Sequence, residues 1–345
     1  MSRNRNRRIT LASRPTGLPT QDVFELDEAH VPTPAAGEMV ARTIYLSLDP
    51  YMRGRMNDVA SYTPAVEIGG VMTGGTVCEV VTSSLDGFET GDIVVGYGGW
   101  QDYATFKAGE ARKVDPSIAP ISTALGVLGM PGHTAYGGLT EIGKPQAGET
   151  LVVAAASGAV GSVVGQIAKI KGCRVVGIAG DDAKCAYVKD ELGFDAAVNH
   201  KAHNFTDQLA AACSDGIDIY WENVGGPVFD AVLPHMNPFA RIPVCGLIHW
   251  YNTTELPTIT DPTPKLMRKI LVNRLTIRGF IVFDFNHLEA DFLRDVSGWI
   301  RDGKLRYRED IRQGLENAPE GLIGLLQGQN FGKMLIQVSD DPTKS

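Results

Sequence analysis

The sequence predicts an α/β protein with two domains, a β-rich domain followed by a doubly wound parallel sheet. Residues 1–125 contain β-branched and aromatic runs separated by Gly, Pro and Asp turns, without a long helical period. From residue 126 onward, apolar strands alternate with helical stretches, which is typical of a parallel sheet covered on both faces. The length of 345 residues exceeds one typical domain and suffices for two.

Six short apolar stretches mark the strands of the predicted parallel sheet. Each is followed by residues with a helical period, as in the Rossmann architecture. The stretches are 150–156, 174–180, 196–200, 217–225, 240–246 and 275–282. An amphipathic helix is predicted near 286–302, so the second domain is expected to span 126–304.

The C-terminal tail, residues 305–345, ends in the apolar strand "GKMLIQV". Because an isolated strand needs a sheet to join, we expect this tail to complete the first domain.

Charge and cysteine content limit the partners and the compartment. The formal net charge is −8, and the basic cluster "RNRNRR" at residues 3–8 predicts only a frayed, solvated terminus. No apolar run reaches the roughly 18 residues of a membrane span. The five scattered cysteines form no C-x-x-C pair, which favours a reducing compartment. We therefore expect a cytoplasmic protein without nucleic-acid or membrane partners.

The glycine-rich stretch "AAASGAVGSVVG" lies between the first predicted strand of the sheet and its helix, where a dinucleotide-binding turn belongs. Gly158 and Gly161 fit the last two glycines of G-x-G-x-x-G, whereas Ala155 replaces the first. Such glycines let the backbone approach a pyrophosphate at the helix N-terminus. Glycines that only pack a helix on a strand would also explain the stretch, but the alternating strands favour a dinucleotide site.

The end of the second strand bears on which nicotinamide cofactor is expected. An acidic residue there would accept the ribose 2′-hydroxyl of NAD and repel a 2′-phosphate. Here the strand ends at Gly180, and Lys184 one turn later can pair with a phosphate. These residues favour NADP. The alternative is that Lys184 is a solvated helix lysine and that Asp181 and Asp182 only begin the helix.

No metal site is predicted. Catalytic zinc takes three protein ligands, typically Cys or His with Asp or Glu. No histidine occurs between His30 and His133, and Cys78 is the only cysteine in that stretch. A carbonyl group is therefore expected to be polarised by an organic side chain, the cofactor or water.

Several motifs, spread in order over nearly the whole chain, resemble those of one enzyme family. They are "YLSLDPYMRGRM", "LGMPGHTAYGGL", "AASGAVG", "ENVGG", "CGLIHWYN", "GFIV" and "NFGKMLIQV". The family is the zinc-independent medium-chain dehydrogenase/reductases, in the leukotriene dehydrogenase and prostaglandin reductase branch that includes bacterial curcumin reductases. The resemblance implies a GroES-like substrate domain, a Rossmann domain that binds NADPH, and a homodimer.

The resemblance also implies the residues that contact the cofactor. These are Gly158, Ala159, Val160, Gly161, Gly180, Lys184, His200, Asn223, Cys245, Tyr251, Phe280, Val282, Asn330 and, near the nicotinamide, Thr134. Many relatives have a tyrosine at the position of His200, so the phosphate contact predicted there depends on a histidine supplying it.

The branch reduces the C=C bond of α,β-unsaturated ketones and aldehydes. Hydride from NADPH reaches the β-carbon, and negative charge accumulates on the carbonyl oxygen as an enolate. A tyrosine with a pKa of about 10 is neutral at pH 7 and donates a hydrogen bond, which stabilises such an oxygen. Tyr251 matches the family's candidate for this role. The alternative is that Tyr251 only packs against the nicotinamide ribose.

Further residues are expected around the substrate. Tyr51 is a second candidate donor or a pocket wall, or else an aromatic anchor for its turn. Arg53 is either a substrate contact or an ion-pair residue within its domain. We expect Trp250 to shape the pocket or an interface, Phe283 to pack or to line the pocket, and His133 to be a hydrogen-bonded structural histidine.

Two alternative functions share the predicted cofactor. A quinone reductase would have the same fold, and a non-enzymatic NADP(H)-binding sensor would bind the cofactor without turnover. Retention of "CGLIHWYN" and of the cofactor set argues against the sensor. The physiological substrate and the face of the nicotinamide that is used do not follow from the sequence.

Overall fold

The computed structural model describes residues 5–253 and 262–344. The chain forms two compact units. The first unit comprises Met1–Gly126 and Glu309–Ser345, and the second unit comprises Val127–Arg308.

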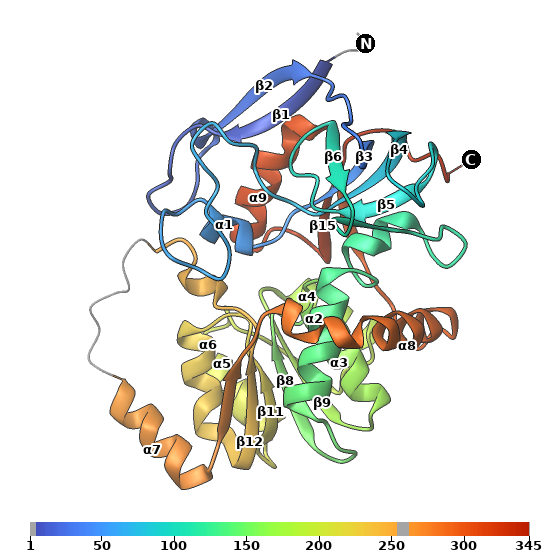
Figure 1. Ribbon diagram of the computed structural model, residues 1–345. Helices are drawn as coiled ribbons and strands as arrows, with labels where there is room; N and C mark the ends of the chain where they lie inside the picture. The colour runs from blue at the N-terminus through green and yellow to red at the C-terminus, as the bar shows by residue number, and fades with distance from the viewer. Residues whose placement is uncertain (1–4, 254–261, 345) are drawn as a thin grey trace. The chain divides into compact units, whose positions relative to one another are not determined.

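The second unit is built around a sheet of six parallel strands (Figure 1). The strand order is β10-β9-β8-β11-β12-β13, so the winding reverses between β8 and β11, as in a Rossmann fold. The strands are β8 (Thr150–Ala154), β9 (Arg174–Ala179), β10 (Ala196–Asn199), β11 (Ile217–Trp221), β12 (Met236–Val244) and β13 (Thr276–Gly279). The predicted doubly wound sheet is confirmed, and β12 begins four residues before the predicted start at residue 240.

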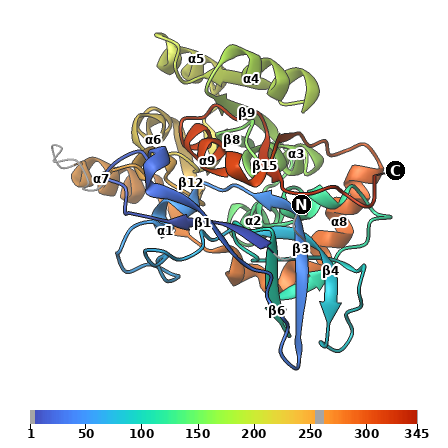
Figure 2. The same ribbon diagram turned by 90° about the horizontal axis from the view of Figure 1, so that it is seen from above.

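Helices cover both faces of this sheet (Figure 2). They are α2 (Met130–Gly138), α3 (Gly161–Ile170), α4 (Asp182–Ala186), α5 (Phe205–Ala212), α6 (Gly226–Val232), α7 (Thr263–Asn273) and α8 (Glu289–Arg301). Helix α2 packs with α3 and α8 on one face, whereas α5 packs with α6 on the other. The predicted amphipathic helix is α8, which buries Phe292 and Val296.

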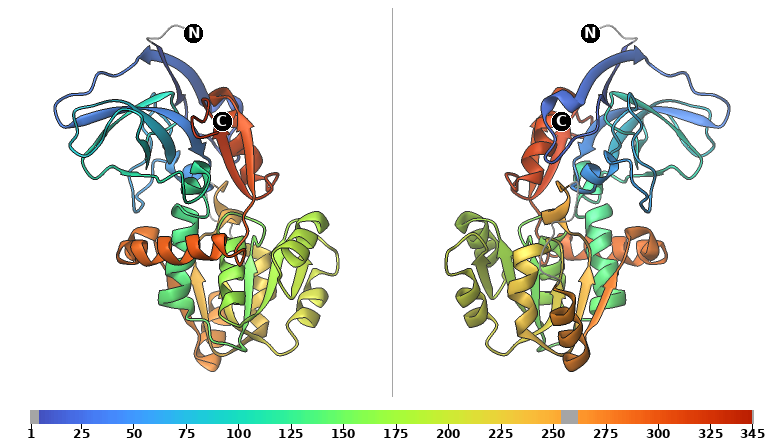
Figure 3. Two further views of the ribbon diagram at one scale, coloured as in Figure 1. Left: turned by 90° about the vertical axis from the view of Figure 1, so that its right-hand side faces the viewer. Right: turned by 90° about the vertical axis from the view of Figure 1, so that its left-hand side faces the viewer.

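The first unit contains a sheet of seven strands in the order β14-β15-β3-β4-β5-β7, with β6 also paired to β3. The strands are β3 (Glu38–Ser47), β4 (Thr76–Ser83), β5 (Ile93–Gly96), β6 (Tyr103–Lys107), β7 (Ala111–Lys113), β14 (Glu309–Gln313) and β15 (Lys333–Gln337). β15 pairs antiparallel with β3. In Figure 3 the red C-terminal segment accordingly lies beside the blue and teal strands of this unit.

Two short helices complete the first unit. Helix α1 (Tyr51–Arg55) follows β3, and helix α9 (Ala318–Leu326) precedes β15. The apolar residues of α9, including Leu322, pack in one core with Leu46 and Trp100.

The N-terminal basic cluster is ordered, which corrects the expectation of a frayed terminus for residues 5–8. β1 (Arg5–Leu11) forms an antiparallel hairpin with β2 (Phe24–His30). The Asn6 amide is buried and bonds to the backbone of Tyr103 in both directions, at 3.0 and 2.9 Å. Arg7 pairs with Asp102 at 2.9 Å. Acidic residues pair with the basic side chains. The positive charge of this segment therefore does not prevent it from forming a strand of the folded unit.

Candidate active site

The glycine-rich turn connects β8 to α3. A Cβ atom added at Gly161 would lie 2.3 Å from the carbonyl oxygen of Ala155, so the helix can begin there only with glycine. Ala155, which replaces the first glycine of the motif, has a φ of +53°. This is the left-handed conformation that glycine adopts without strain. The tight turn is therefore formed despite the substitution.

Basic groups gather where β9 and β10 end. Gly180 follows β9, and a Cβ atom added there would lie 3.5 Å from Nε2 of His200 and 4.0 Å from Nζ of Lys201. Burial lowers the pKa of His200, and the positive charges of Lys201 and Lys184 lower it further. The three side chains therefore form a basic cluster (Lys184, His200 and Lys201). A dianionic phosphate suits such a cluster.

Lys184 is not a solvated helix lysine, so that alternative is wrong. Its side chain is 10% exposed, and its Nζ lies 3.7 Å from Oδ2 of Asp181. Asp181 caps helix α4 by accepting a bond from the Lys184 amide at 2.8 Å. Lys201 was missing from the sequence prediction. Its position directly after His200 was the available sign, because the residue that follows a strand tip shares the same sheet edge.

Asn223 lies beyond the carboxyl end of β11, which pairs with β8, and Cys245 lies beyond the carboxyl end of β12, which pairs with β11. The Asn223 amide donates to the carbonyl oxygen of Ala154 at 2.7 Å and accepts a bond from the indole of Trp221 at 3.1 Å. It therefore links the end of β11 to the end of β8. Burial raises the pKa of the Cys245 thiol to about 12, so this thiol is protonated at neutral pH and is no nucleophile.

Tyr251 follows the short helix η6 (Ile248–Trp250) in the loop after β12. Its side chain is half-buried. The hydroxyl group accepts a bond of 3.4 Å from the Leu247 amide, and a Cβ atom added at Gly246 would lie 3.0 Å from it. The phenol is therefore folded back over the backbone that leaves β12, next to Cys245.

His249 and Trp250 pack against a double glycine. Their rings contact each other edge to face, with 4.5 Å between centroids. Gly225 and Gly226 have φ values of +76° and +58°, and a Cβ atom on Gly226 would lie 2.5 Å from the His249 ring. A Cβ atom on Gly225 would lie 3.0 Å from Nε1 of Trp250. Glycine is therefore required at both positions, by conformation and by space.

Helix α2 carries Thr134 and His133, both buried. The Thr134 hydroxyl donates to the carbonyl oxygen of Met130 at 2.7 Å. Nε2 of His133 lies 2.9 Å from the carbonyl oxygen of Phe285, and the ring stacks on Phe292 at 5.1 Å. His133 is thus a hydrogen-bonded structural histidine, as predicted.

Phe280, Val282 and Phe283 follow β13 but have different surroundings. The Phe280 ring is 8% exposed and packs edge to face on Trp221, with 5.6 Å between centroids. Any cofactor contact of Phe280 is therefore left to its backbone. Val282 begins the short helix η7 (Val282–Leu288), and Phe283 is 50% exposed.

Tyr51 lies at the start of α1 in the first unit. It is half-buried against the apolar core of that unit. Burial raises the pKa of its phenol well above 10, and the nearby Asp49, Tyr97 and Tyr62 raise it further. Tyr51 therefore remains a hydrogen-bond donor throughout the physiological pH range.

Arg53 is a structural residue, which corrects its prediction as a substrate contact. Its side chain is fully buried. The guanidinium donates to the carbonyl oxygens of Pro15 and Gly17, at 2.8 to 3.3 Å, and to Oδ1 of Asn57 at 2.6 Å. These bonds hold the segment around residue 15 against α1 and leave the group inaccessible to a substrate.

Asn330 belongs to the loop before β15, where its amide donates to the carbonyl oxygen of Gly332 at 2.7 Å. The neighbouring Lys333 was not anticipated from the sequence. It is 4% exposed and pairs with Asp49 at 2.7 Å, while also donating to the carbonyl oxygen of Leu48 at 2.8 Å. The C-terminal strand therefore fixes the segment that precedes Tyr51.

Comparison with known proteins decides the family. Residues 7–114 match the family model described as N-terminal domain of oxidoreductase, and residues 159–297 match the one described as zinc-binding dehydrogenase. Over 340 residues the chain is 55% identical to the NADPH-dependent curcumin reductase of Escherichia coli (strain K12), with 98% of this chain and 99% of the relative covered. This chain is a medium-chain dehydrogenase/reductase of the prostaglandin and curcumin reductase branch. The resemblance inferred from the motifs is confirmed.

Two further relatives of this reductase support the assignment. The 2-alkenal reductase (NADP(+)-dependent) of Nicotiana tabacum is 39% identical over 340 residues, with 97% of this chain and 98% of the relative covered. The crystal structure of CurA in complex with NADPH from Vibrio vulnificus is 55% identical and superposes with a TM-score of 0.94. It covers 97% of this chain and 100% of that chain.

Neither a metal-ligand cluster nor a membrane-spanning helix occurs among the described residues of this reductase. Among residues 5–253 and 262–344, no three His, Cys, Asp or Glu side chains lie together as potential metal ligands. The word zinc in the description of the second family model therefore has no ligand cluster to refer to in this part of the chain. In the same ranges, no helix has the length and the apolar character to cross a membrane.

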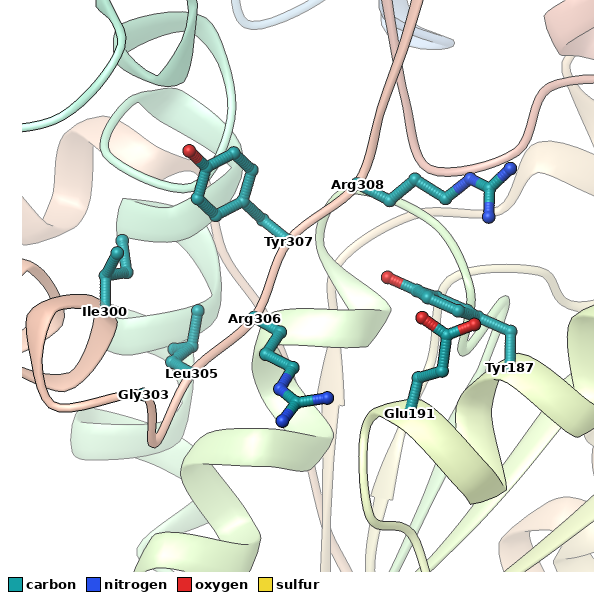
Figure 4. Close-up of a pocket in the computed structure, with 8 residues that line it drawn as sticks. All are labelled: Tyr187, Glu191, Ile300, Gly303, Leu305, Arg306, Tyr307 and Arg308. Atoms are coloured by element: carbon teal, nitrogen blue, oxygen red, sulfur yellow. The ribbon is translucent and has the colours of Figure 1, made fainter.

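The second unit also has a cavity of about 440 Å³ that none of the predicted site residues lines (Figure 4). Its lining residues are Tyr187, Glu191, Ile300, Gly303, Leu305, Arg306, Tyr307 and Arg308. The Arg308 guanidinium lies 5.8 Å from the ring centroid of Tyr187. The cavity is therefore distinct from the dinucleotide turn, and we assign no function to it.

Proposed function

We propose that the protein is an NADPH-dependent reductase of the C=C bond of α,β-unsaturated ketones and aldehydes. The match along nearly the whole chain to reductases named for curcumin and 2-alkenal carries this conclusion. In this proposal the first unit is the substrate domain and the second unit is the NADP-binding domain.

NADPH is the cofactor, as in the solved relative. The residues of this chain fit the group. Glycine at position 161 lets the chain turn tightly into α3, and we propose that the pyrophosphate binds at the N-terminus of this helix. The basic cluster is our proposed site for the 2′-phosphate, with the buried Lys184 as its central charge. Asn223 and Cys245 are proposed to line the path toward the nicotinamide.

The chemistry supplied by bound NADPH is a hydride for the β-carbon of the substrate. We propose that the Tyr251 hydroxyl then donates a hydrogen bond to the carbonyl oxygen on which negative charge accumulates. Tyr51 is the second candidate for this donor, and its raised pKa keeps its proton in place. Burial keeps the Cys245 thiol protonated, so no covalent step through it belongs to this mechanism.

A substrate panel tests the proposed function. Purified protein is mixed with NADPH and a short alkenal, a bulky enone or a quinone, and NADPH absorbance is followed. In a fourth assay, an alcohol is mixed with NADP⁺ in place of NADPH. We expect the alkenal and the enone to be reduced with the highest kcat/KM. A quinone that exceeds both would favour a quinone reductase, and cofactor binding without any turnover would favour a sensor.

We further propose a homodimer formed through β13 and α7. In the described part of the chain β13 pairs only with β12, so its other edge is open. Three apolar side chains of α7 are exposed: Met267 (56%), Leu271 (77%) and Val272 (58%). An open strand edge beside an exposed apolar face is a typical place for a second copy to bind.

The change Leu271→Glu is expected to convert the dimer to a monomer, because it buries a charge in the proposed interface. Light scattering after size-exclusion chromatography measures the molar mass. Leu26→Glu is the matched control, since Leu26 is 52% exposed in β2 of the first unit. A wild-type protein that is monomeric, or a Leu271→Glu variant that stays dimeric, would contradict this interface.

A cytoplasmic location also remains a proposal. Its support is that all five cysteines are free thiols, and three of them, including Cys78, are buried.

A further inference from the structure

Glu222 is a buried carboxylate for which the proposed mechanism has no role. It follows β11, and its side chain is 1% exposed. Oε1 accepts hydrogen bonds from the amides of Val224 and Gly225 at 2.5 and 2.8 Å. Oε2 accepts one from the hydroxyl of Tyr220 at 3.1 Å. A buried charge is costly unless hydrogen bonds satisfy it, so these bonds must persist in the folded protein.

The side chain of Glu222 accepts hydrogen bonds from its own turn and from Tyr220 at the end of β11. Within residues 5–253 and 262–344, no Lys, Arg or His side chain forms an ion pair with this carboxylate. Burial raises the pKa of Glu222, while the amides of Val224 and Gly225 and the Tyr220 hydroxyl lower it. Its charge is therefore held mainly by backbone amides. This arrangement fixes the conformation of residues 222–225 rather than linking two elements through a salt bridge.

The turn fixed by Glu222 is hydrogen-bonded to the loop that carries Tyr251. Four amides of that loop donate to carbonyl oxygens of the turn. The bonds are Cys245 to Glu222 (2.9 Å), Gly246 to Glu222 (3.2 Å), Ile248 to Asn223 (3.2 Å) and His249 to Val224 (3.0 Å). The rings of His249 and Trp250 rest on Gly225 and Gly226 of the same turn.

Tyr251 is the next residue in this arrangement. Its amide donates to the carbonyl oxygen of Ile248 at 3.2 Å, and its hydroxyl accepts from the amide of Leu247 at 3.4 Å. Both partners, Ile248 and Leu247, belong to the loop that is hydrogen-bonded to the turn. A shift of the turn therefore moves the phenol, and a misplacement of about 1 Å can cost roughly 10²-fold in rate.

We propose that Glu222 is a positioning residue for Tyr251, holding the turn that sets where the phenol hydroxyl lies. This inference rests on the proposed role of Tyr251 as the hydrogen-bond donor. Glu222 itself contacts neither substrate nor cofactor in this proposal.

A double-mutant cycle on the full-length protein tests this role. The variants are Glu222→Ala, Tyr251→Phe and the combination, assayed for kcat and KM with an enone and for the Kd of NADPH. Glu222→Ala is expected to lower kcat by about 10-fold to 100-fold, with a much smaller change in the Kd of NADPH. In the Tyr251→Phe background the same change is expected to cost less than about threefold, because the group that it positions is already missing. Losses that multiply would overturn the proposal.

Two further substitutions separate positioning from folding. Glu222→Gln keeps an oxygen that can accept both amide bonds, so it is expected to restore most of the kcat lost in Glu222→Ala. Tyr220→Phe removes only the third bond and is expected to change kcat by less than about threefold. Thermal unfolding of every variant is recorded. If Glu222→Ala does not fold, Glu222→Asp replaces it in the cycle, and the same loss of coupling is required.

The cycle also distinguishes the two levels of the proposal. An unchanged kcat in Tyr251→Phe would refute the donor role and, with it, the positioning role. A lowered kcat in Tyr251→Phe together with a normal kcat in Glu222→Ala would refute the positioning role alone. A loss in Glu222→Ala that Glu222→Gln does not restore would also count against it.

Discussion

Tyr251→Phe is expected to lower kcat for enone reduction by about 10²-fold to 10³-fold, the usual cost of removing one donor from a developing oxyanion. The Kd of NADPH is expected to change little. The ring remains in place, and the bond of 3.4 Å between the hydroxyl and the Leu247 amide lies within the loop. Steady-state rates with an enone, together with NADPH binding measured by fluorescence, give both quantities.

Two companion variants make the Tyr251 result specific. Tyr103→Phe removes a phenol hydroxyl from β6 of the first unit and is expected to leave kcat unchanged. Tyr51→Phe tests the second candidate donor. A normal kcat in Tyr251→Phe with a large loss in Tyr51→Phe would transfer the donor role to Tyr51. A raised Kd for NADPH as the main effect of Tyr251→Phe would mean that the phenol serves the cofactor ribose instead.

Lys184→Ala is expected to weaken NADPH binding by roughly 10-fold to 100-fold, since a hydrogen bond to a charged group contributes about 1.5–3 kcal/mol. The affinity for NADH, which has no 2′-phosphate, is expected to stay the same. Dissociation constants for both cofactors are measured by titration at fixed ionic strength, because salt screens such contacts. The discrimination between the two cofactors should therefore fall by the same factor.

Lys189→Ala is the matched control for the cofactor experiment. Lys189 is exposed in the helical turn that follows α4, so its removal changes the net charge equally without touching the basic cluster. Equal weakening of NADPH and NADH by Lys184→Ala would show a general disturbance of the fold and would contradict a 2′-phosphate site. If Lys189→Ala weakened NADPH binding as much as Lys184→Ala, the loss would be explained by the change in net charge and not by a contact with the 2′-phosphate.

The positions of the strands were predictable from the sequence, but the side chains that the sheet brings together at its edge were only partly so. The alternation of apolar runs and helical stretches locates six strands. It also predicts their parallel direction, because short crossover helices join them. Lys201 was missed although it directly follows His200, because its closeness to Gly180 depends on the pairing of β10 with β9. Two members of the basic cluster, Lys184 and His200, were therefore named at the sequence level, and Lys201 was not.

Side-chain hydrogen bonds explain the other errors. Arg53 lies in a motif that suggests a substrate site, and nothing local shows that the carbonyl oxygens of Pro15 and Gly17 enclose it. Glu222 is part of a motif matched by resemblance, yet its bonds to Val224 and Gly225 appear only in three dimensions. Burial of a charged residue depends on partners from distant segments, which residue type and spacing do not reveal.

The pairing of β15 with β3 has a consequence for the order of events on the ribosome. The second unit, Val127–Arg308, has left the ribosome complete before β14 and β15 emerge. It can therefore fold first, although it lies in the middle of the chain. Until β15 emerges, β3 has an open edge, and Asp49 lacks its buried partner Lys333. The first unit therefore cannot complete its sheet before then, and during that interval its exposed strand edge is the part of the nascent chain most in need of protection.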